Sequence, residues 1–346
     1  MELRVGIVRD DRYFVHQTGV THPERAARLK AVYRMLDKDF ADGLIAIEPE
    51  PATLEQLELV HSPAYIRKLL RTPEREVTHL AQDTPAGTQT YVSAWLAVGG
   101  CIRAFHSLLS RRCDACVCLV RPPGHHATRK GAGGFCIFNN LGITATYAIE
   151  RHGLQRILII DWDIHHGNGL QELFYDRKEV FYLSTHYKGW YPYSGDWDEV
   201  GKGEGLGYTV NVPISKDVSD EELTSLYRKL LGPILRNYNP EMIMIAAGFD
   251  AHWRDPLGRT QVTENAFGVL TEMILELRDD VRRPPILMAL EGGYDPAALA
   301  ASVRQVLSAL TFKGKKKPVN IPSNPRAVEL AQKTVGIHKN FRVWTE

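Results

Sequence analysis

The sequence predicts a three-layer α/β fold, with helices on both faces of a mostly parallel central sheet. Short apolar runs rich in Val, Ile and Leu recur along the chain and are mostly continuous rather than alternating, which is typical of strands buried on both faces of a parallel sheet. Helix-like stretches lie between these runs, so strands and helices alternate. We find no internal repeat, low-complexity tract or long linker, and therefore expect residues 1–346 to form one domain.

The continuous apolar runs predict strands at residues 5–8, 115–120, 157–160, 180–183, 242–246 and 286–290. The stretches between them predict helices at residues 23–36, 88–109, 220–235, 263–277 and 296–310. The first helix follows Thr21 and His22 and has an early proline, as helix N-termini often do. Residues 311–346 form a C-terminal extension after the last expected helix. We interpret its basic run as a solvated linker, formed by Lys313, Lys315, Lys316 and Lys317.

The composition excludes some classes of partner. The 346 residues carry a net charge of +1, so bulk electrostatics give no reason to expect a nucleic acid or an acidic lipid surface. The five cysteines are odd in number and irregularly spaced, which argues against a disulfide framework and for a reducing compartment. Cys113 and Cys116 form one C-x-x-C, but a structural zinc site needs a second pair, which is absent from the sequence.

The chain shows no sign of membrane targeting. Its N-terminus has no apolar signal-peptide region, and we find no apolar stretch near the ~18 residues that span a bilayer. We therefore expect a soluble cytoplasmic protein with no membrane partner.

Ionisable side chains crowd the segment after the strand expected at 157–160. In an extended segment Asp161, Asp163 and His165 point the same way, and His166 and Asn168 follow them closely. Burying several ionisable groups together is costly unless they pair or bind a cation. A surface turn with incidental charges is therefore the weaker interpretation.

Three other expected strand ends carry polar residues of the same kind: His125 and His126 in 121–127, Asp250 in 248–252, and Tyr294 behind two glycines in 291–295. Singly, each has an ordinary explanation, such as an aspartate that caps a helix. Together, two Asp and one His make a three-ligand metal set with an open fourth position, as catalytic rather than structural zinc sites have. Two further His and a Tyr then remain for proton transfer and oxyanion stabilisation.

These motifs resemble those of the zinc-dependent histone deacetylase family, the deacetylase branch of the arginase/deacetylase fold. The matching segments run in family order over about residues 1–310. They are His22-Pro23-Glu24-Arg25, Val60-His61-Ser62-Pro63-Ala64-Tyr65, Arg121 to Ala127, Gly134-Phe135-Cys136, Asp161 to Gly169, Gly248-Phe249-Asp250 and Glu291 to Tyr294. The Arg-Pro-Pro-Gly-His-His and Glu-Gly-Gly-Tyr forms are more similar to class II enzymes and their bacterial homologues than to class I.

The resemblance implies a role for each residue of the site. The ligands of one zinc ion per chain match Asp163, His165 and Asp250. The general base and acid matches His126, and its electrostatically supportive neighbour matches His125. Their hydrogen-bond partners match Asp161 and Asn168, and the residue that polarises the substrate carbonyl matches Tyr294.

The resemblance also implies an entrance and a second cation. The walls of an acyl-lysine tunnel match Gly134, Phe135, Tyr191 and Leu257, and a rim carboxylate that grips the substrate backbone matches Asp83. The alternative interpretation of Asp83, which is the weaker one, is a cap that flanks the helix at 88–109. A structural potassium site, held largely by backbone carbonyls, matches Asp161, Asp163, His165, Ser184 and Thr185.

One departure from class I concerns Asn168, which stands where that class has an Asp. An amide orients an imidazole but cannot stabilise its cation by full charge, so we expect a less elevated pKa for His126 than an Asp would give. Tyr294 is present, which favours a competent deacetylase.

We therefore expect an amidohydrolase that uses metal-activated water to remove acetyl or other short acyl groups from acylated lysine side chains. Acetylpolyamines or other small amides are the alternative substrates, but the short stretch at 71–90 favours an open entrance. A binuclear manganese ureohydrolase would need a second acid where Asp250-Ala251-His252 has none, and a non-catalytic acyl-lysine binder would not need a complete set. Zinc and ferrous iron both suit these ligands, and the oligomeric state stays open.

Overall fold

The computed structural model describes residues 2–314, 318–341 and 344, and an eight-stranded sheet lies at its centre. The strand order is β2-β1-β5-β10-β9-β6-β7-β8, and every neighbouring pair is parallel. The strands are β1 (Val5–Val8), β2 (Leu44–Ile47), β5 (Ala115–Cys118), β6 (Ile157–Asp161), β7 (Val180–Tyr187), β8 (Thr209–Ile214), β9 (Met242–Ala247) and β10 (Ile286–Leu290). This arrangement confirms the expected parallel sheet.

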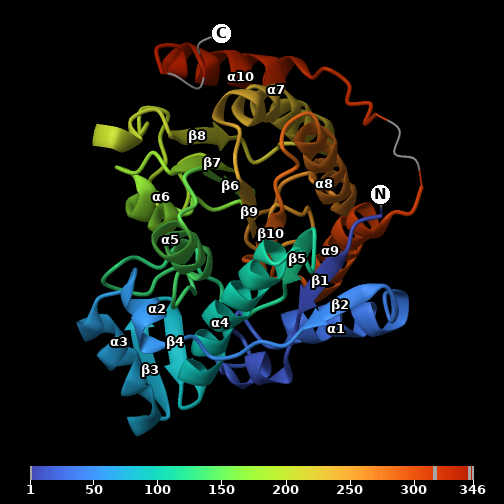
Figure 1. The fold of residues 1–346 in the computed structure, drawn as a ribbon. Coiled ribbons are helices and arrows are strands. Elements are labelled where there is room, and N and C mark those ends of the chain that lie inside the picture. The colour runs from blue at the N-terminus through green and yellow to red at the C-terminus, as the bar shows by residue number, and fades with distance from the viewer. Residues whose placement is uncertain (1, 315–317, 342–343, 345–346) are drawn as a thin grey trace.

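Helices cover both faces of the sheet (Figure 1). One face carries α1 (Ala27–Asp39), α9 (Pro296–Thr311), α8 (Glu264–Asp279) and α7 (Asp220–Tyr238), which pack in that order. The other face carries α4 (Thr90–Leu109), α5 (Asn140–His152) and α6 (Asn168–Phe174). The molecule therefore has the three layers that the sequence predicts.

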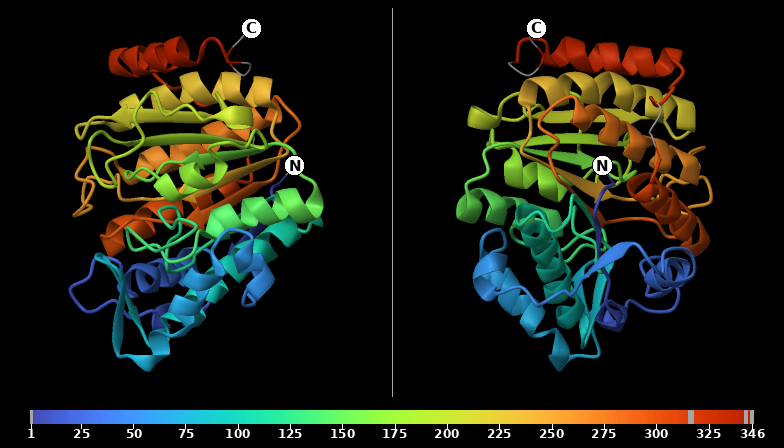
Figure 2. Two further views of the ribbon diagram at one scale, coloured as in Figure 1. Left: turned by 90° about the vertical axis from the view of Figure 1, so that its left-hand side faces the viewer. Right: turned by 45° about the vertical axis from the view of Figure 1, so that its right-hand side comes forward.

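Smaller elements complete the described chain. Between β2 and α4 lie α2 (Leu54–Glu58), α3 (Pro63–Leu70), the 3₁₀ turn η2 (Thr72–Glu74) and an antiparallel hairpin of β3 (Val77–Ala81) and β4 (Thr84–Gly87). Two further 3₁₀ turns are η1 (Asp11–Val15) and η3 (Gly203–Gly205), and α10 (Pro325–His338) packs on α7 and β8. The hairpin and α10 lie at opposite ends of the molecule (Figure 2).

The eight-stranded sheet contains all six expected strands and two that were not predicted, and the two strands of the hairpin were not predicted either. The apolar run of β8 is interrupted by the polar residues Thr209 and Asn211 and by Pro213, which has no backbone N–H. A proline is tolerated there because β8 is an edge strand, where one side of the backbone needs no ladder partner. The other missed strand, β2, lies at the opposite edge and is short and half-exposed.

Two expected helix starts were wrong. The helix expected from residue 23 begins at Ala27. Glu24 precedes it, and its fully buried side chain pairs with Arg28 and Arg121. The helix expected from residue 88 begins at Thr90.

The C-terminal extension contains the helix α10, which was not predicted from the sequence. Of the basic run, Lys313 forms an exposed ion pair with Glu2 at 2.9 Å, while residues 315–317 lie outside the described part of the chain.

One helix also corrects the expectation about apolar stretches. By length and mean hydropathy (1.3), α4 is long and apolar enough to cross a membrane, and it is the only such helix in the part of the chain that the structure describes. However, 72% of its apolar window is buried inside the molecule, where it packs on β5, β1 and β10. In this respect α4 resembles the core helix of a globular protein.

Candidate active site

The four central strands end at one edge of the sheet, and the predicted catalytic residues lie at those ends. His125 and His126 follow β5, and Asp161 ends β6, with Asp163 and His165 just after it. Two further strands add one residue each, Asp250 after β9 and Tyr294 after β10. All of these side chains are buried, with at most 7% of their surface exposed. Parallel strands thus bring together residues that are far apart in the sequence, as expected for this fold class.

Asp163, His165 and Asp250 form a compact group with the composition of a metal site. Their potential ligand atoms lie within 4.8 Å of one another. His165 Nδ1 lies 3.1 Å from Asp163 Oδ1 and 2.9 Å from Asp250 Oδ2. Burial and the nearby charge of Asp163 raise the pKa of Asp250 to about 7. Two carboxylates this close in a buried place repel each other, and a bound divalent cation would relieve the repulsion.

Backbone amides hold both carboxylates in place. Asp163 Oδ1 accepts a hydrogen bond from the His165 amide at 2.8 Å, and its Oδ2 accepts one from the Gly292 amide at 2.9 Å. Asp250 Oδ1 accepts one from the Ile164 amide at 3.0 Å. The loops after β6, β9 and β10 are therefore joined through the candidate ligands themselves.

The two adjacent histidines have different partners. His125 Nδ1 bonds to Asp161 Oδ2 at 3.1 Å, whereas His126 Nδ1 bonds to the side-chain oxygen of Asn168 at 2.9 Å. Because an amide oxygen only accepts, Nδ1 of His126 carries the hydrogen, and Nε2 is left free to accept a proton.

The pKa values of these histidines move in opposite directions. Burial lowers the pKa of His125, but the charges of Asp163 and Asp161 outweigh it and raise the value to about 10. Burial and the positive charges of His125 and His165 hold the pKa of His126 well below its usual value. The site thus pairs a cationic imidazole with a neutral one, and the neutral ring is the candidate base.

Tyr294 is held between two side chains. The Arg28 guanidinium lies over its ring at 4.8 Å from the centroid, and the Phe135 ring meets it edge-on at 5.5 Å. Arg28 also donates to the carbonyl oxygens of Glu291 and Gly293, both at 2.5 Å. A buried arginine therefore fixes the loop that carries Tyr294.

The expected entrance residues are also brought together in part. The Tyr191 ring lies 5.1 Å from the His126 ring, and a side chain on Gly134 would place its Cβ 2.1 Å from His126 Cδ2, so the chain passes very close to this imidazole. Phe135 contacts Tyr294 and also His22, whose ring centroid is 4.7 Å away. Leu257 is half-buried on the loop that follows Asp250.

Asp83 does not flank a helix, which excludes the capping interpretation. It lies between β3 and β4, at the turn of the hairpin, and α4 begins seven residues later at Thr90. Its Oδ2 accepts a hydrogen bond from the Gly134 amide at 3.1 Å, and its Oδ1 accepts one from the Thr84 hydroxyl at 2.8 Å. Asp83 is therefore a half-buried carboxylate beside an entrance wall.

The residues expected to hold potassium lie at and just after the end of β6 and beside it within β7. The strand register pairs Asp161 with Ser184, and Thr185 follows. The Tyr227 hydroxyl lies 2.8 Å from Thr185 Oγ1 and 3.5 Å from the carbonyl oxygen of Asp161.

The sequence reading missed two buried carboxylates in the site. Glu291 Oε2 accepts hydrogen bonds from the Gly124 and His125 amides at 2.6 and 3.1 Å, and burial raises the pKa of Glu291 to about 7. Asp255 accepts bonds from the loops that carry Leu257 and Tyr294. Glu291 could have been predicted as a site residue from its position at a strand end. Asp255 could not, because its partners are backbone groups of distant loops.

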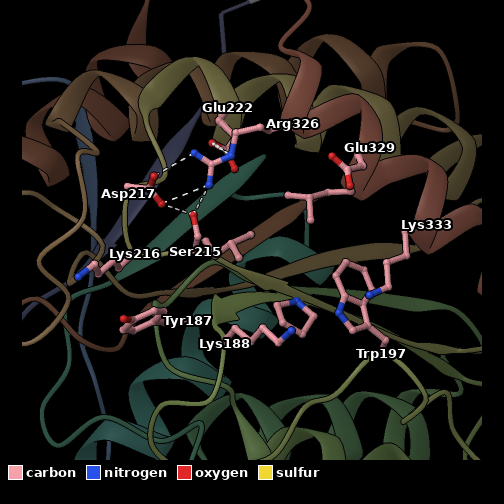
Figure 3. Close-up of a pocket in the computed structure, with 13 residues that line it drawn as sticks. Tyr187, Lys188, Trp197, Ser215, Lys216, Asp217, Glu222, Arg326, Glu329 and Lys333 are labelled. Carbon is pink, nitrogen blue, oxygen red and sulfur yellow. Dashed lines mark hydrogen bonds and ion pairs between the residues drawn. The ribbon is translucent and has the colours of Figure 1, made fainter.

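A separate cavity of about 530 Å³ lies between α10 and the ends of β7 and β8 (Figure 3). Arg326 pairs there with Asp217 at 3.1 Å, and Lys333 lies over the Trp197 ring at 4.2 Å. The residues that line it include none of the predicted site residues.

Comparisons with known proteins agree with this geometry. The histone deacetylase domain matches residues 22–310. A probable deacetylase of Archaeoglobus fulgidus is 33% identical over 293 residues, which are 84% of this chain and 81% of that protein. The human polyamine deacetylase HDAC10 is 35% identical over 300 residues, 83% of this chain but 44% of that protein. The crystal structure of the HDA15 HD domain matches with a TM-score of 0.90 and 32% identity, covering 98% of this chain and 97% of that one.

Proposed function

Because the chain belongs to the histone deacetylase family, we propose that it is a zinc-dependent enzyme that removes acetyl or other short acyl groups from acylated lysine side chains. The family's deacetylases are hydrolases that act on amide bonds. The observation that carries the proposal is the buried Asp163–His165–Asp250 group beside a neutral histidine, His126.

Asp163, His165 and Asp250 fit a single zinc ion, since three oxygen and nitrogen ligands with an open position are the usual set of a catalytic site. When bound, zinc would polarise the acyl carbonyl and lower the pKa of a water molecule. Zinc is the metal typical of the histone deacetylase family.

The residues of the chain then divide the remaining work. Nε2 of His126 accepts the proton of the attacking water, because Nδ1 is committed to Asn168. The Tyr294 hydroxyl donates a hydrogen bond to the oxygen on which negative charge develops. His126 returns its proton to the leaving amine, and the products are a free amine and a carboxylate. The cationic His125 stays paired with Asp161 and adds positive charge beside the reaction.

The substrate class rests on the entrance. Among the entrance residues predicted from the sequence, Asp83 is the only acid. A polyamine carries further ammonium groups, which would need further carboxylates at the rim, so an acylated lysine fits better. Acetylpolyamine hydrolysis is the second candidate, favoured by the likeness to a human protein named as a polyamine deacetylase.

Three subsidiary proposals follow from the same residues. Potassium would bind as a structural ion beside the end of β6, at Asp161 and the neighbouring β7 residues Ser184 and Thr185. Residues 1–346 would act as one domain, since α10 packs on α7 and β8. The five buried free cysteines support a cytoplasmic location, where thiols stay reduced.

The metal proposal predicts about one zinc per chain and the loss of both zinc and turnover in Asp250→Ala and His165→Ala. Elemental analysis and hydrolysis of a fluorogenic acetyl-lysine peptide measure the two quantities. Asp217→Ala, an exposed acid beside α10, is the control and should retain both. Two equivalents of manganese, both required for activity, would contradict the proposal. A chain that binds the peptide without turnover would be a binder rather than an enzyme.

A further inference from the structure

Asp255 is a buried carboxylate that joins two parts of the site. It lies five residues after Asp250, on the loop that follows β9, and 2% of its surface is exposed. Its own amide donates to the carbonyl of His252 at 2.8 Å, which fixes the residue within that loop. Every hydrogen bond recorded for its carboxylate comes from a backbone N–H group.

The two carboxylate oxygens serve different segments. Oδ2 accepts from the amides of Tyr294 and Asp295, at 2.5 and 3.3 Å. Oδ1 accepts from the amides of Leu257 and Gly258, at 2.9 and 3.4 Å. One side chain therefore connects the loop after β10, which carries Tyr294, to the entrance wall at Leu257.

This division requires a carboxylate. An asparagine has one acceptor oxygen, so it would keep one segment and turn its NH₂ group toward the N–H donors of the other. An alanine would leave the backbone donors of both segments without their acceptor in a buried place. Neither replacement preserves the connection.

We propose that Asp255 is a positioning residue that fixes Tyr294 relative to the entrance wall and the Asp250 loop. The inference rests on the proposed function, because Tyr294 acts on the substrate carbonyl only in a deacetylase. Asp255 itself acts through the Tyr294 backbone and touches no reacting atom. Its effect on turnover therefore passes through the position of the Tyr294 hydroxyl.

A double-mutant cycle between Asp255→Asn and Tyr294→Phe tests this dependence. Tyr294→Phe alone should lower kcat about 10²- to 10³-fold, as the loss of one oxyanion donor does, with little change in KM. Asp255→Asn alone should lower kcat roughly 10- to 100-fold, the usual range for a residue that orients a catalytic group. In the Tyr294→Phe background, the same substitution should cost less than about threefold, because the hydroxyl it positions is already absent.

Glu241→Gln is the matched control. The Glu241 carboxylate also accepts two backbone N–H groups, from Gln155 and Arg156 at 2.7 and 3.0 Å, but through one oxygen and just before β9, at the opposite edge of the sheet. This variant should leave kcat unchanged in both backgrounds. Asp255→Glu retains two acceptor oxygens and should keep more of the wild-type kcat than Asp255→Asn does. If Asp255→Asn does not fold, Asp255→Glu replaces it in the cycle with Tyr294→Phe.

Amide hydrogen exchange provides a readout that does not depend on turnover. Asp255→Asn should speed exchange at the amides of residues 292–295, at those of residues 257–259, or at both, while exchange near Glu241 stays as in the wild type. Unchanged exchange in both segments would overturn the inference. So would an Asp255→Asn penalty on kcat of equal size in both backgrounds, since it would show a role independent of Tyr294. A wild type without hydrolytic activity would refute the proposed function instead, and exchange would then decide the connection by itself.

Discussion

Single residues in this site owe their chemistry to the atoms placed next to them. His125 and His126 are neighbours in sequence, and their ring centroids are 3.9 Å apart. Burial lowers the pKa of both rings, but the charges of Asp163 and Asp161 outweigh it at His125, whereas the positive charges of His125 and His165 add to it at His126, so the two pKa values move in opposite directions. Two identical side chains can thus serve as a fixed charge and as a base.

Asp83 offers a residue-scale test of the substrate class. Asp83→Ala should lower kcat/KM for an acetyl-lysine peptide by about tenfold or more, since charge-assisted bonds to two peptide N–H groups would be lost. The same change should affect a small acetylated amine much less, because that substrate has no peptide backbone. Parallel kinetics on an acyl-lysine peptide panel and on acetylpolyamines measure both.

Glu76→Ala supplies the control for that experiment, because Glu76 is an exposed acid just before the same hairpin. An equal loss for both substrates in a stable Asp83→Ala protein would mean that Asp83 only braces Gly134. A wild type that prefers acetylpolyamines to every peptide would reject the lysine proposal but leave the zinc amidohydrolase intact.

At the scale of elements, the loop after β10 depends on a glycine. A Cβ on Gly292 would lie 2.2 Å from Asp250 Oδ2 and 2.6 Å from Asp163 Oδ2, distances at which atoms overlap. A glycine permits this close approach of the backbone, and the Gly292 amide uses it to donate a hydrogen bond to Asp163 Oδ2 at 2.9 Å.

Gly292→Ala should therefore displace Asp163 or Asp250 and lower both bound zinc and turnover. The control is Gly336→Ala in α10, where the new Cβ would point into open space. That variant should keep its metal and gain up to about 1 kcal/mol of stability from the better helix propensity of alanine. Full zinc occupancy in Gly292→Ala would show that the loop can relax.

Some elements have a sequence pattern from which they can be predicted, and others do not. The central strands were predictable because burial on both faces makes them continuous apolar runs, and their ends located His126, Asp163, Asp250 and Tyr294. The edge strands and the hairpin were not, since partial exposure and Pro213 remove that pattern. The role of Asp255 could not be predicted for another reason: the backbone N–H groups that donate to it become its neighbours only after the loops have packed.

At the scale of the whole molecule, buried histidines make stability depend on pH. His61 is fully buried; its Nδ1 bonds to the Thr128 carbonyl and its Nε2 accepts from the Asn139 amide, both at 2.9 Å. Burial lowers its pKa to about 4. Burial likewise lowers the pKa of His16 to about 3 and that of His338 to about 4. These rings are neutral in the folded protein and must be protonated on unfolding at acidic pH.

The sign follows from proton binding. Between pH 6.5 and about 4 the unfolded chain binds more protons at His61 than the folded chain, so stability falls as pH falls, by at most about 1.4 kcal/mol per pH unit per histidine. Urea unfolding of the wild type and of His61→Gln at pH 7, 6 and 5 isolates the contribution of His61 from those of the other buried groups. His61→Gln supplies a donor and an acceptor without titrating, and should give a shallower dependence. An unchanged slope in that variant would show that His61 does not contribute.

Asp163 and Asp250 accept hydrogen bonds from the backbone amides of Ile164, His165 and Gly292. These bonds also bear on how the enzyme would acquire a metal. Since the donors of these hydrogen bonds belong to the protein's own backbone, folding alone would position the candidate ligands. Chain synthesis and metallation can then be separate events in time. Which divalent ion arrives, zinc or ferrous iron, would be decided by the supply inside the cell at that moment, and the same polypeptide could be emptied and refilled without being rebuilt.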